Sequence, residues 1–438
     1  MTNEEISTKL KGTPVQGLYG ATLGFFTGFA AVALFGPTAN AFKGAMGLSP
    51  LLVGLLVAVP ALSGSLLRIP FSAWADTVGG RKPFLILLSL SIIGMLGLSL
   101  VVYLLYPNNM SPDLYPFLLI LGALSGCGIA TFSVGVSQVS YWYPQKRQGS
   151  ALGIYAGVAN LAPGIFSIIL PFALSSIGLV GSYIAWLFFL VIGTVFYYLL
   201  GRNSWYFQLR KQGLSPDDAR IDAKKQGQEL FPAKKLSESL KISAKIWKTW
   251  SLVIIYFTSF GGFIALTAWF PTYWTSFFAV APVTAGLLTA LYSILTSLTR
   301  MGGGVVSDKL GGENTLLLAL ITALAGGSLM TVSSSFYLSI SAVILMALGM
   351  GMSNAAVFKI VPQEIPQAVG GASGWVGGLG AFGGFAIPPI MSAFVNGPGD
   401  IGYARGFLVF IILSGVSLTM AYTLKRTTRN RKKIVGNE

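Results

Sequence analysis

Two arginines lie well inside apolar segments of this 438-residue chain: Arg68 in PALSGSLLRIPFSAWAD and Arg300 in SILTSLTRMGGGVVSD. No Asp or Glu falls near the middle of any apolar segment. A charged side chain without a partner in an apolar environment costs at least a few kcal/mol. The expected partner is therefore an anion from solution, and the planar fork of donors on arginine suits a planar oxyanion.

Other reactive residue types are scarce. The chain has one cysteine, Cys127, and no histidine. An intrachain disulfide, a Ser-His-Asp triad and a histidine metal site are therefore excluded. We expect no metal, no cofactor and no enzymatic activity.

The composition is that of a membrane protein. Hydrophobic residues make up 53% of the chain and charged residues 10%, against roughly 25% charged in soluble domains. The mean hydropathy is +0.71. These values exclude a soluble enzyme, a disordered protein and a nucleic-acid binder, despite the net charge of +15. We expect a multi-pass protein in a lipid bilayer.

Twelve apolar segments are long enough to span a bilayer, which takes about 20 residues each. Because they are continuously apolar and do not alternate, a transmembrane barrel is disfavoured. The predicted fold is all-α, with twelve transmembrane helices in two pseudo-symmetric six-helix bundles. The predicted spans are 18–40, 51–72, 83–106, 115–141, 151–175, 179–201, 249–272, 282–305, 315–333, 335–358, 370–394 and 402–424.

The two predicted halves repeat each other in sequence. Arg68 lies eight residues before Asp76, and Arg300 lies eight before Asp308; a Gly-Gly pair follows each aspartate. This repeat places both arginines on the central axis between the halves. The alternative is that each arginine snorkels or binds helix-end carbonyls, but this does not explain their symmetric placement. Two further pairs of segments match, 26–38 with 260–272 and 149–157 with 370–378.

A polar stretch separates the halves. We expect an N-terminal bundle over 1–201, a cytoplasmic linker over 202–248 and a C-terminal bundle over 249–438 with a basic cytoplasmic tail. Within the linker, Ser215-Pro216-Asp217-Asp218 is typical of a helix start. We interpret the linker as a solvated connection with a short surface helix, with regulation as the alternative.

Lysine and arginine gather in one set of loops, in the linker and in the tail TLKRTTRNRKK. This asymmetry predicts a cell-membrane protein with both termini in the cytoplasm. Asp76, Arg81 and Asp308 lie in the short cytoplasmic loops. We expect them to pair with neighbouring helix ends and to hold one gate.

Glycine and alanine are dense in the fifth and eleventh spans. Close helix packing explains part of this; the functional interpretation is that the glycines bring backbone near a substrate and let the helices bend. The candidate signature glycines are Gly153, Gly157, Gly374, Gly377 and Gly378. Asn160 is the polar residue among those of the fifth span.

At these residues the chain resembles the nitrate/nitrite porter family of the major facilitator superfamily. The segments that carry the resemblance are PALSGSLLRIPFSAWADTVGGRKP, TRMGGGVVSDKLGG, YWYPQKRQGSALGIYAGVANLAPG and GGASGWVGGLGAFGGFAIPP. The resemblance covers essentially the whole chain. It implies that Arg68 and Arg300 bind the substrate. It also implies that Phe132 and Phe260 lie above and below the anion, with Tyr256 and Asn160 beside it.

The expected function is transport of nitrate or nitrite by a monomer through alternating access. We expect nitrate/nitrite exchange, because proton symport usually relies on an intramembrane Asp, Glu or His. The alternatives are a proton-coupled nitrate symporter and an exchanger of organic anions such as oxalate or formate. A sensor or scaffold would be expected to carry a large soluble domain, whereas the longest polar stretch here is 202–248.

Overall fold

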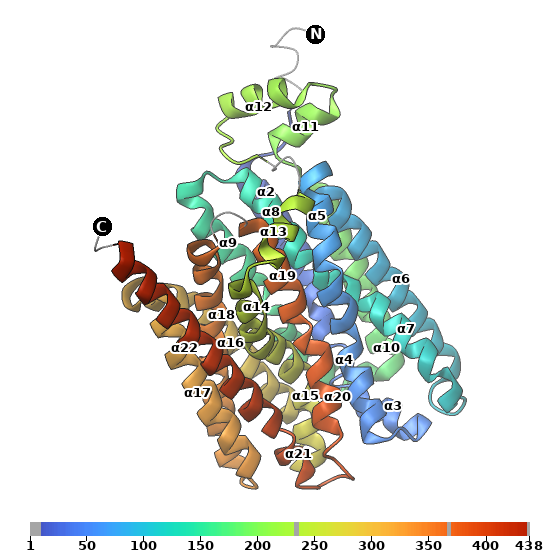
Figure 1. Ribbon diagram of the computed structural model, residues 1–438. Helices are drawn as coiled ribbons and strands as arrows, with labels where there is room; N and C mark the ends of the chain where they lie inside the picture. Colours follow the sequence, from blue (N-terminus) through green and yellow to red (C-terminus); the bar gives the residue numbers. More distant parts are fainter. Residues whose placement is uncertain (1–9, 232–235, 366–368, 436–438) are drawn as a thin grey trace.

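The computed structural model describes residues 10–231, 236–365 and 369–435, and all of its regular elements there are helical (Figure 1). The first half contains α2 (Pro14–Phe29), η1 (Ala30–Ala33), α3 (Ala39–Met46), α4 (Pro50–Leu66), α5 (Arg68–Val78), α6 (Arg81–Leu105), η2 (Pro112–Leu114), α7 (Tyr115–Gly126), η3 (Cys127–Ala130), α8 (Thr131–Trp142), α9 (Gln145–Ala159) and α10 (Ala162–Leu200).

The regular elements described in the linker and in the second half are also helical. The linker contains α11 (Trp205–Lys211), α12 (Pro216–Lys225) and α13 (Leu236–Ala244). The second half contains α14 (Trp247–Tyr256), the π-helical turn η4 (Phe257–Gly261), α15 (Gly262–Phe277), α16 (Pro282–Leu310), α17 (Gly312–Val332), α18 (Phe336–Glu364), α19 (Val369–Ala381), α20 (Gly383–Ser392), α21 (Gly402–Arg405) and α22 (Leu408–Val435).

Eleven helical segments of the described chain are long and apolar enough to cross a membrane, and one of them, Ala151–Leu200, is 50 residues long. This segment folds back on itself. Gly178 has non-helical backbone angles (φ 68°, ψ −176°), and the rings of Phe166 and Trp186 lie 4.8 Å apart. In a continuous helix, residues 20 positions apart would be separated by about 30 Å. The eleven segments therefore make the twelve predicted spans.

The sequence repeat reappears in the backbone. Gly79 and Gly311 occupy equivalent positions after the second and eighth spans. Both have left-handed φ angles, 82° and 86°, with ψ of 159° and 147°. Side chains rarely adopt such angles, which explains the glycine at each position. The two halves are thus related in structure as well as in sequence.

Helices α11 and α12 cover one end of the bundle, called here the linker end, and α3 lies at the opposite, far end (Figure 1). The predicted helix start in the linker is confirmed. The Ser215 hydroxyl accepts a hydrogen bond from the backbone N–H of Asp218 at 3.1 Å, and Pro216 is the first residue of α12. Helix α13 is attached to α19, since Trp375 Nε1 donates to the Leu240 carbonyl at 3.1 Å.

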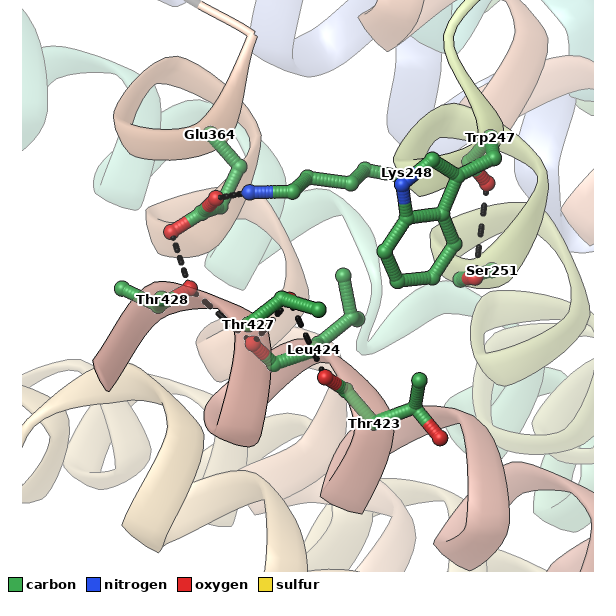
Figure 2. Close-up of polar contacts among 8 residues, drawn as sticks. All are labelled: Trp247, Lys248, Ser251, Glu364, Thr423, Leu424, Thr427 and Thr428. Carbon is green, nitrogen blue, oxygen red and sulfur yellow. Dashed lines mark hydrogen bonds and ion pairs between the residues drawn. The ribbon is translucent and has the colours of Figure 1, made fainter. Parts of the chain in front are cut away.

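A buried ion pair holds three helices of the second half together near the linker end. Lys248 of α14 pairs with Glu364 of α18, and the side chains are 14% and 6% exposed. The other carboxylate oxygen of Glu364 accepts a hydrogen bond from the Thr428 hydroxyl of α22 at 2.7 Å (Figure 2). The carboxylate is therefore paired on both sides.

The two halves pack closely at the far end. A Cβ atom on Gly54 of α4 would lie 2.3 Å from Ser392 Oγ of α20, and one on Gly36 would lie 2.5 Å from the Ala268 carbonyl oxygen. Asn40 Nδ2 also donates to Thr275 Oγ1 at 3.0 Å across the halves. These contacts leave no space for a side chain at either glycine and join the halves on this side.

Candidate functional site

The predicted site residues lie where the helices are irregular. Arg68 is the first residue of α5, directly after the break between α4 and α5. Phe132 follows the 3₁₀ turn η3, Phe260 lies within the π-helical turn η4, and Asn160 ends α9. Such interruptions within helices are frequent at functional sites, because they redirect side chains and free backbone groups. Arg300 is the exception, since it lies within the regular part of α16.

Arg68 is fully buried, with 0% of its surface exposed. Its Nε donates to the Gly64 carbonyl at 3.0 Å, and its Nη1 donates to the Gly377 carbonyl of the second half at 3.2 Å. The third nitrogen, Nη2, is buried and has no hydrogen-bond partner. Arg68 thus connects the two halves and keeps the N–H donors of Nη2 unused.

Arg300 lies beside the same aromatic rings. The guanidinium carbon of Arg68 is 4.9 Å from the centre of the Phe132 ring and 5.2 Å from that of Phe260. The corresponding distances for Arg300 are 6.0 and 5.3 Å. Arg300 is half-buried, and its Nη1 is buried without a partner. The structure therefore brings both arginines and both phenylalanines together.

Neither arginine has an acidic partner among the side chains that the structure describes. Among the described side chains, the ion pairs join Lys225 to Asp222 and Lys248 to Glu364. Cation–π contacts supply about 0.5–2 kcal/mol each, whereas burying an ion costs several kcal/mol. The two adjacent guanidinium groups therefore each keep one buried nitrogen without a hydrogen-bond partner, an arrangement that favours negative charge nearby.

The two phenylalanine rings do not yet have room for an anion between them. Their centres are 6.1 Å apart and their planes are inclined by 31°. A planar ion stacked between two rings needs about 7 Å, because each contact takes at least roughly 3.5 Å. In this conformation the guanidinium groups of Arg68 and Arg300 lie against the rings.

Tyr256 and Asn160 are buried beside this group. The Tyr256 ring stacks on Phe260 at 4.9 Å, and its hydroxyl has no partner. Asn160 is 2% exposed, and its Oδ1 has no partner. The Asn160 carbonyl accepts a hydrogen bond from Ser297 Oγ at 3.1 Å, which places it one helical turn from Arg300. Both side chains thus have unused polar groups near the arginines.

The signature glycines differ in how tightly they are packed. A Cβ atom on Gly378 would lie 2.6 Å from Ile69 Cγ1, whereas one on Gly157 would lie 3.2 Å from the flexible Met301 Sδ. The nearest atoms would be at 3.4 Å for Gly374 and 4.0 Å for Gly377, and Gly153 has none within 4 Å. Only Gly378 is a steric requirement in this conformation.

Of the three predicted gate residues, the structure describes the side chain of Arg81. Arg81 Nη2 donates to the Tyr198 carbonyl at 2.8 Å, and the Arg81 backbone N–H donates to Asn203 Oδ1 at 2.9 Å. These contacts hold the start of α6 to the end of α10 and to the first residues of the linker. The side chains of Asp76 and Asp308 lie outside the described part of the structure, so the gate stays a prediction.

Sequence reasoning missed Tyr155 and assigned no role to Asn354, which lies in GMSNAAVFKIVP of the tenth span. The Tyr155 hydroxyl donates to the carbonyls of Thr131 and Phe132 at 3.1 and 3.0 Å, so it positions the backbone that carries Phe132. No sequence pattern marks this role. Asn354 is 1% exposed, with an unpartnered Oδ1. An amide side chain inside an apolar segment is a sequence signal that indicates a candidate functional position.

Twelve membrane-spanning helices form two related halves, and between them lie two arginines that have no acidic partner among the described side chains. These features define a multi-pass membrane protein built like a solute transporter. The chain belongs to the Major Facilitator Superfamily, whose family model matches residues 21–388 and 274–438. This membership confirms the fold expected from the sequence.

Individual relatives agree with this assignment. The chain is 29% identical over 445 residues to a probable nitrate/nitrite antiporter, NarK1, of Thermus thermophilus, covering 96% of this chain and 94% of the relative. It is 26% identical to a probable nitrate transporter, NarT, of Staphylococcus epidermidis, covering 92% and 95%. These relatives confirm the resemblance to the nitrate/nitrite porter family.

Among solved structures, a partially occluded, inward-open form of the xylose transporter XylE from E. coli superimposes with a TM-score of 0.71 at 15% identity. The match covers 95% of this chain and 99% of that one. At this identity the likeness concerns the fold alone.

Proposed function

We propose that this protein transports nitrate and nitrite across the cell membrane by alternating access, with the anion held between Arg68 and Arg300. The observation that carries the proposal is the arginine pair itself. Both guanidinium groups lie against the same two phenylalanine rings, and each keeps a buried nitrogen without a partner. The names of full-length relatives supply the substrate class.

Binding of a planar oxyanion requires a small rearrangement. The anion takes hydrogen bonds from Arg68 Nη2 and Arg300 Nη1, which draws the guanidinium groups toward it. Phe132 and Phe260 then move apart from their separation of 6.1 Å and lie above and below the ion. Tyr256 and Asn160 supply polar contacts at its edge. Because the Arg68 Nη1 bond to Gly377 crosses the halves, binding also acts on their relative position.

The mode of transport that we propose is exchange. Two unpaired guanidinium groups are costly to carry through a closed, water-poor state, and a bound anion offsets part of that cost. The loaded protein therefore reorients faster than the empty one. The described carboxylate of Glu364, which would otherwise be a candidate for proton coupling, is paired with Lys248 near the linker end.

We also propose that the linker end faces the cytoplasm, with 202–248 connecting an N-terminal bundle over 1–201 to a C-terminal bundle over 249–438. The support is the concentration of lysine and arginine in the loops and the linker at this end. The contacts between α4 and α20 then close the outer side.

The experiment that tests this function is uptake of labelled nitrate into proteoliposomes loaded with nitrite, with oxalate or with an inert anion. Exchange predicts fast uptake only when nitrite is inside. Equal uptake into all vesicles, driven by an inward proton gradient, would replace exchange with symport. Uptake that depends on internal oxalate would favour an organic-anion exchanger. Absence of nitrate uptake in every case would refute the proposed function.

A further inference from the structure

A cavity of about 250 Å³ adjoins the arginine pair on its linker side. It begins at Phe132, extends along α8 to Tyr141, and is bordered at the other end by Leu230 and Phe231 of the linker. Nine residues of helix correspond to about 13 Å. The cavity is therefore a passage between the arginine pair and the linker end. Its volume is sufficient for a small oxyanion together with several water molecules.

Five serines from both halves line this passage: Ser72 of α5, Ser133, Ser137 and Ser140 of α8, and Ser373 of α19. On α8 the spacing of four and three residues places them on one helix face. Because they come from three helices, the hydroxyls surround the passage on more than one side.

The hydroxyls of this passage differ from those elsewhere in the bundle. Buried serines in helices commonly donate to a carbonyl one turn earlier, as Ser259 does to Ile255 at 3.1 Å and Ser297 to Ser293 at 2.8 Å. Within the described residues, four of the lining serines make no such bond and are half-buried: Ser72, Ser133, Ser137 and Ser373. Their donors are available to whatever occupies the cavity.

The arginine pair gives the passage its charge. Arg68 binds the carbonyl of Gly377 and lies over the ring of Phe132, and both of these residues line the cavity. Its fully buried Nη2 has no partner. None of the lining residues is acidic. Free hydroxyl donors close to a cation, in a lining whose described residues include no carboxylate, form an environment for an anion.

We propose that this passage is a second anion-binding site, in which serine hydroxyls hold a small monovalent oxyanion between the arginine pair and the linker end. The inference rests on the proposed function. An anion that leaves the two guanidinium groups loses their strong hydrogen bonds. The serine hydroxyls replace part of these hydrogen bonds before the anion reaches water and is fully hydrated. The second site is weaker than the first and is reached from one side of the membrane only.

Sidedness of the kinetics tests this second site. Ser133→Ala, Ser137→Ala and Ser373→Ala are combined in one variant, and labelled nitrate entry is measured in vesicles of either orientation. The apparent KM for nitrate presented at the linker side should rise about tenfold, while the KM at the far side stays within about twofold. Ser137→Thr, which keeps the hydroxyl, should behave like the unaltered protein.

Ser341→Ala is the matched control, because Ser341 is an exposed serine of α18 whose hydroxyl donates to the Tyr337 carbonyl at 3.2 Å. Unchanged KM values at both sides in the triple variant would overturn the proposal. Equal increases at both sides would also overturn it, because the serines would then act on the arginine site. Arg68→Ala, by contrast, should impair entry from both sides.

A second measurement does not depend on transport. Crystals of the full chain soaked in bromide should show an anomalous peak within hydrogen-bond distance of Ser133, Ser137 or Ser373, in addition to one at the arginine pair. A peak at the arginine pair alone would refute the second site and leave the proposed function standing. If nitrate is not transported at all, this experiment still decides whether the serine passage binds an anion.

Discussion

Replacing Gly378 with alanine should disturb the arginine site through a single methyl group. The new Cβ atom would lie 2.6 Å from Ile69 Cγ1 and 3.0 Å from Ile69 Cδ1, about 1 Å closer than ordinary van der Waals contact. Ile69 follows Arg68 at the start of α5, and Gly377, which precedes Gly378, accepts a hydrogen bond from Arg68. The overlap therefore acts on the residue next to Arg68 and on the residue next to its acceptor, Gly377.

The expected size of this effect follows from the overlap. Inserting a methylene group into a well-packed region costs about 1–3 kcal/mol, which corresponds to roughly a fivefold to hundredfold change in an equilibrium. Ile69 is β-branched and has few alternative rotamers, so it does not move aside easily. We expect the KM for nitrate entry to rise at least about tenfold in Gly378→Ala.

Two glycines of the fifth span provide a graded control. Gly157 corresponds to Gly378 in the repeat, and its Cβ would meet only the flexible end of Met301 at 3.2 Å. Gly153 has no atom within 4 Å, and alanine is favoured over glycine in a helix by about 1 kcal/mol.

The KM for nitrate should therefore rise strongly in Gly378→Ala, rise about twofold in Gly157→Ala and stay unchanged in Gly153→Ala. The melting temperature of Gly153→Ala should equal or exceed that of the unaltered protein. The assay is initial nitrate entry into proteoliposomes together with thermal unfolding in detergent. Equal effects at all three positions would show that close packing at Gly378 does not matter, and would refute the steric argument.

Two further variants test the supports of the site and of the bundle. Glu364→Ala leaves Lys248 buried without its partner and should destabilise the protein by about 3–5 kcal/mol. Lys225→Ala, which breaks an exposed pair, should cost under about 1 kcal/mol. Similar melting temperatures of the two variants would contradict this difference. Tyr155→Phe removes the donor to the Phe132 carbonyl and should weaken nitrate binding about fivefold, from roughly 1 kcal/mol for a hydrogen bond. Calorimetric titration with nitrate measures this, and unchanged affinity would show that the hydroxyl does not position Phe132.

The sequence was sufficient to predict the spans, the repeat and the meeting of Arg68 with Arg300, because each depends on hydropathy, on local spacing or on symmetry. The packing of individual groups depends on distant segments and could not be predicted. Gly153 and Gly378 look alike in sequence, but only Gly378 faces Ile69 of the other half. Likewise, the role of Tyr155 depends on where the 3₁₀ turn before Phe132 ends.

The conformation of the aromatic rings could not be predicted from the sequence either. The resemblance implies that Phe132 and Phe260 lie on either side of an anion, whereas their ring centres are 6.1 Å apart and the guanidinium groups lie against them. The π-helical turn at Phe257–Gly261, which carries Phe260, has no clear sequence signal. The stacked arrangement therefore remains a prediction for the anion-bound state.

Nitrate binding to the purified protein tests the central claim most directly. Calorimetric titration is performed on the unaltered protein, on Arg68→Lys, on Arg300→Lys and on the control Arg405→Lys, since Arg405 is exposed at the end of α21. Lysine keeps the charge but lacks the planar fork, and a charge-assisted hydrogen bond is worth about 1.5–3 kcal/mol. The account predicts at least a tenfold loss of affinity in Arg68→Lys and in Arg300→Lys and none in Arg405→Lys. Near-normal affinity in both site variants would contradict it and place the anion elsewhere.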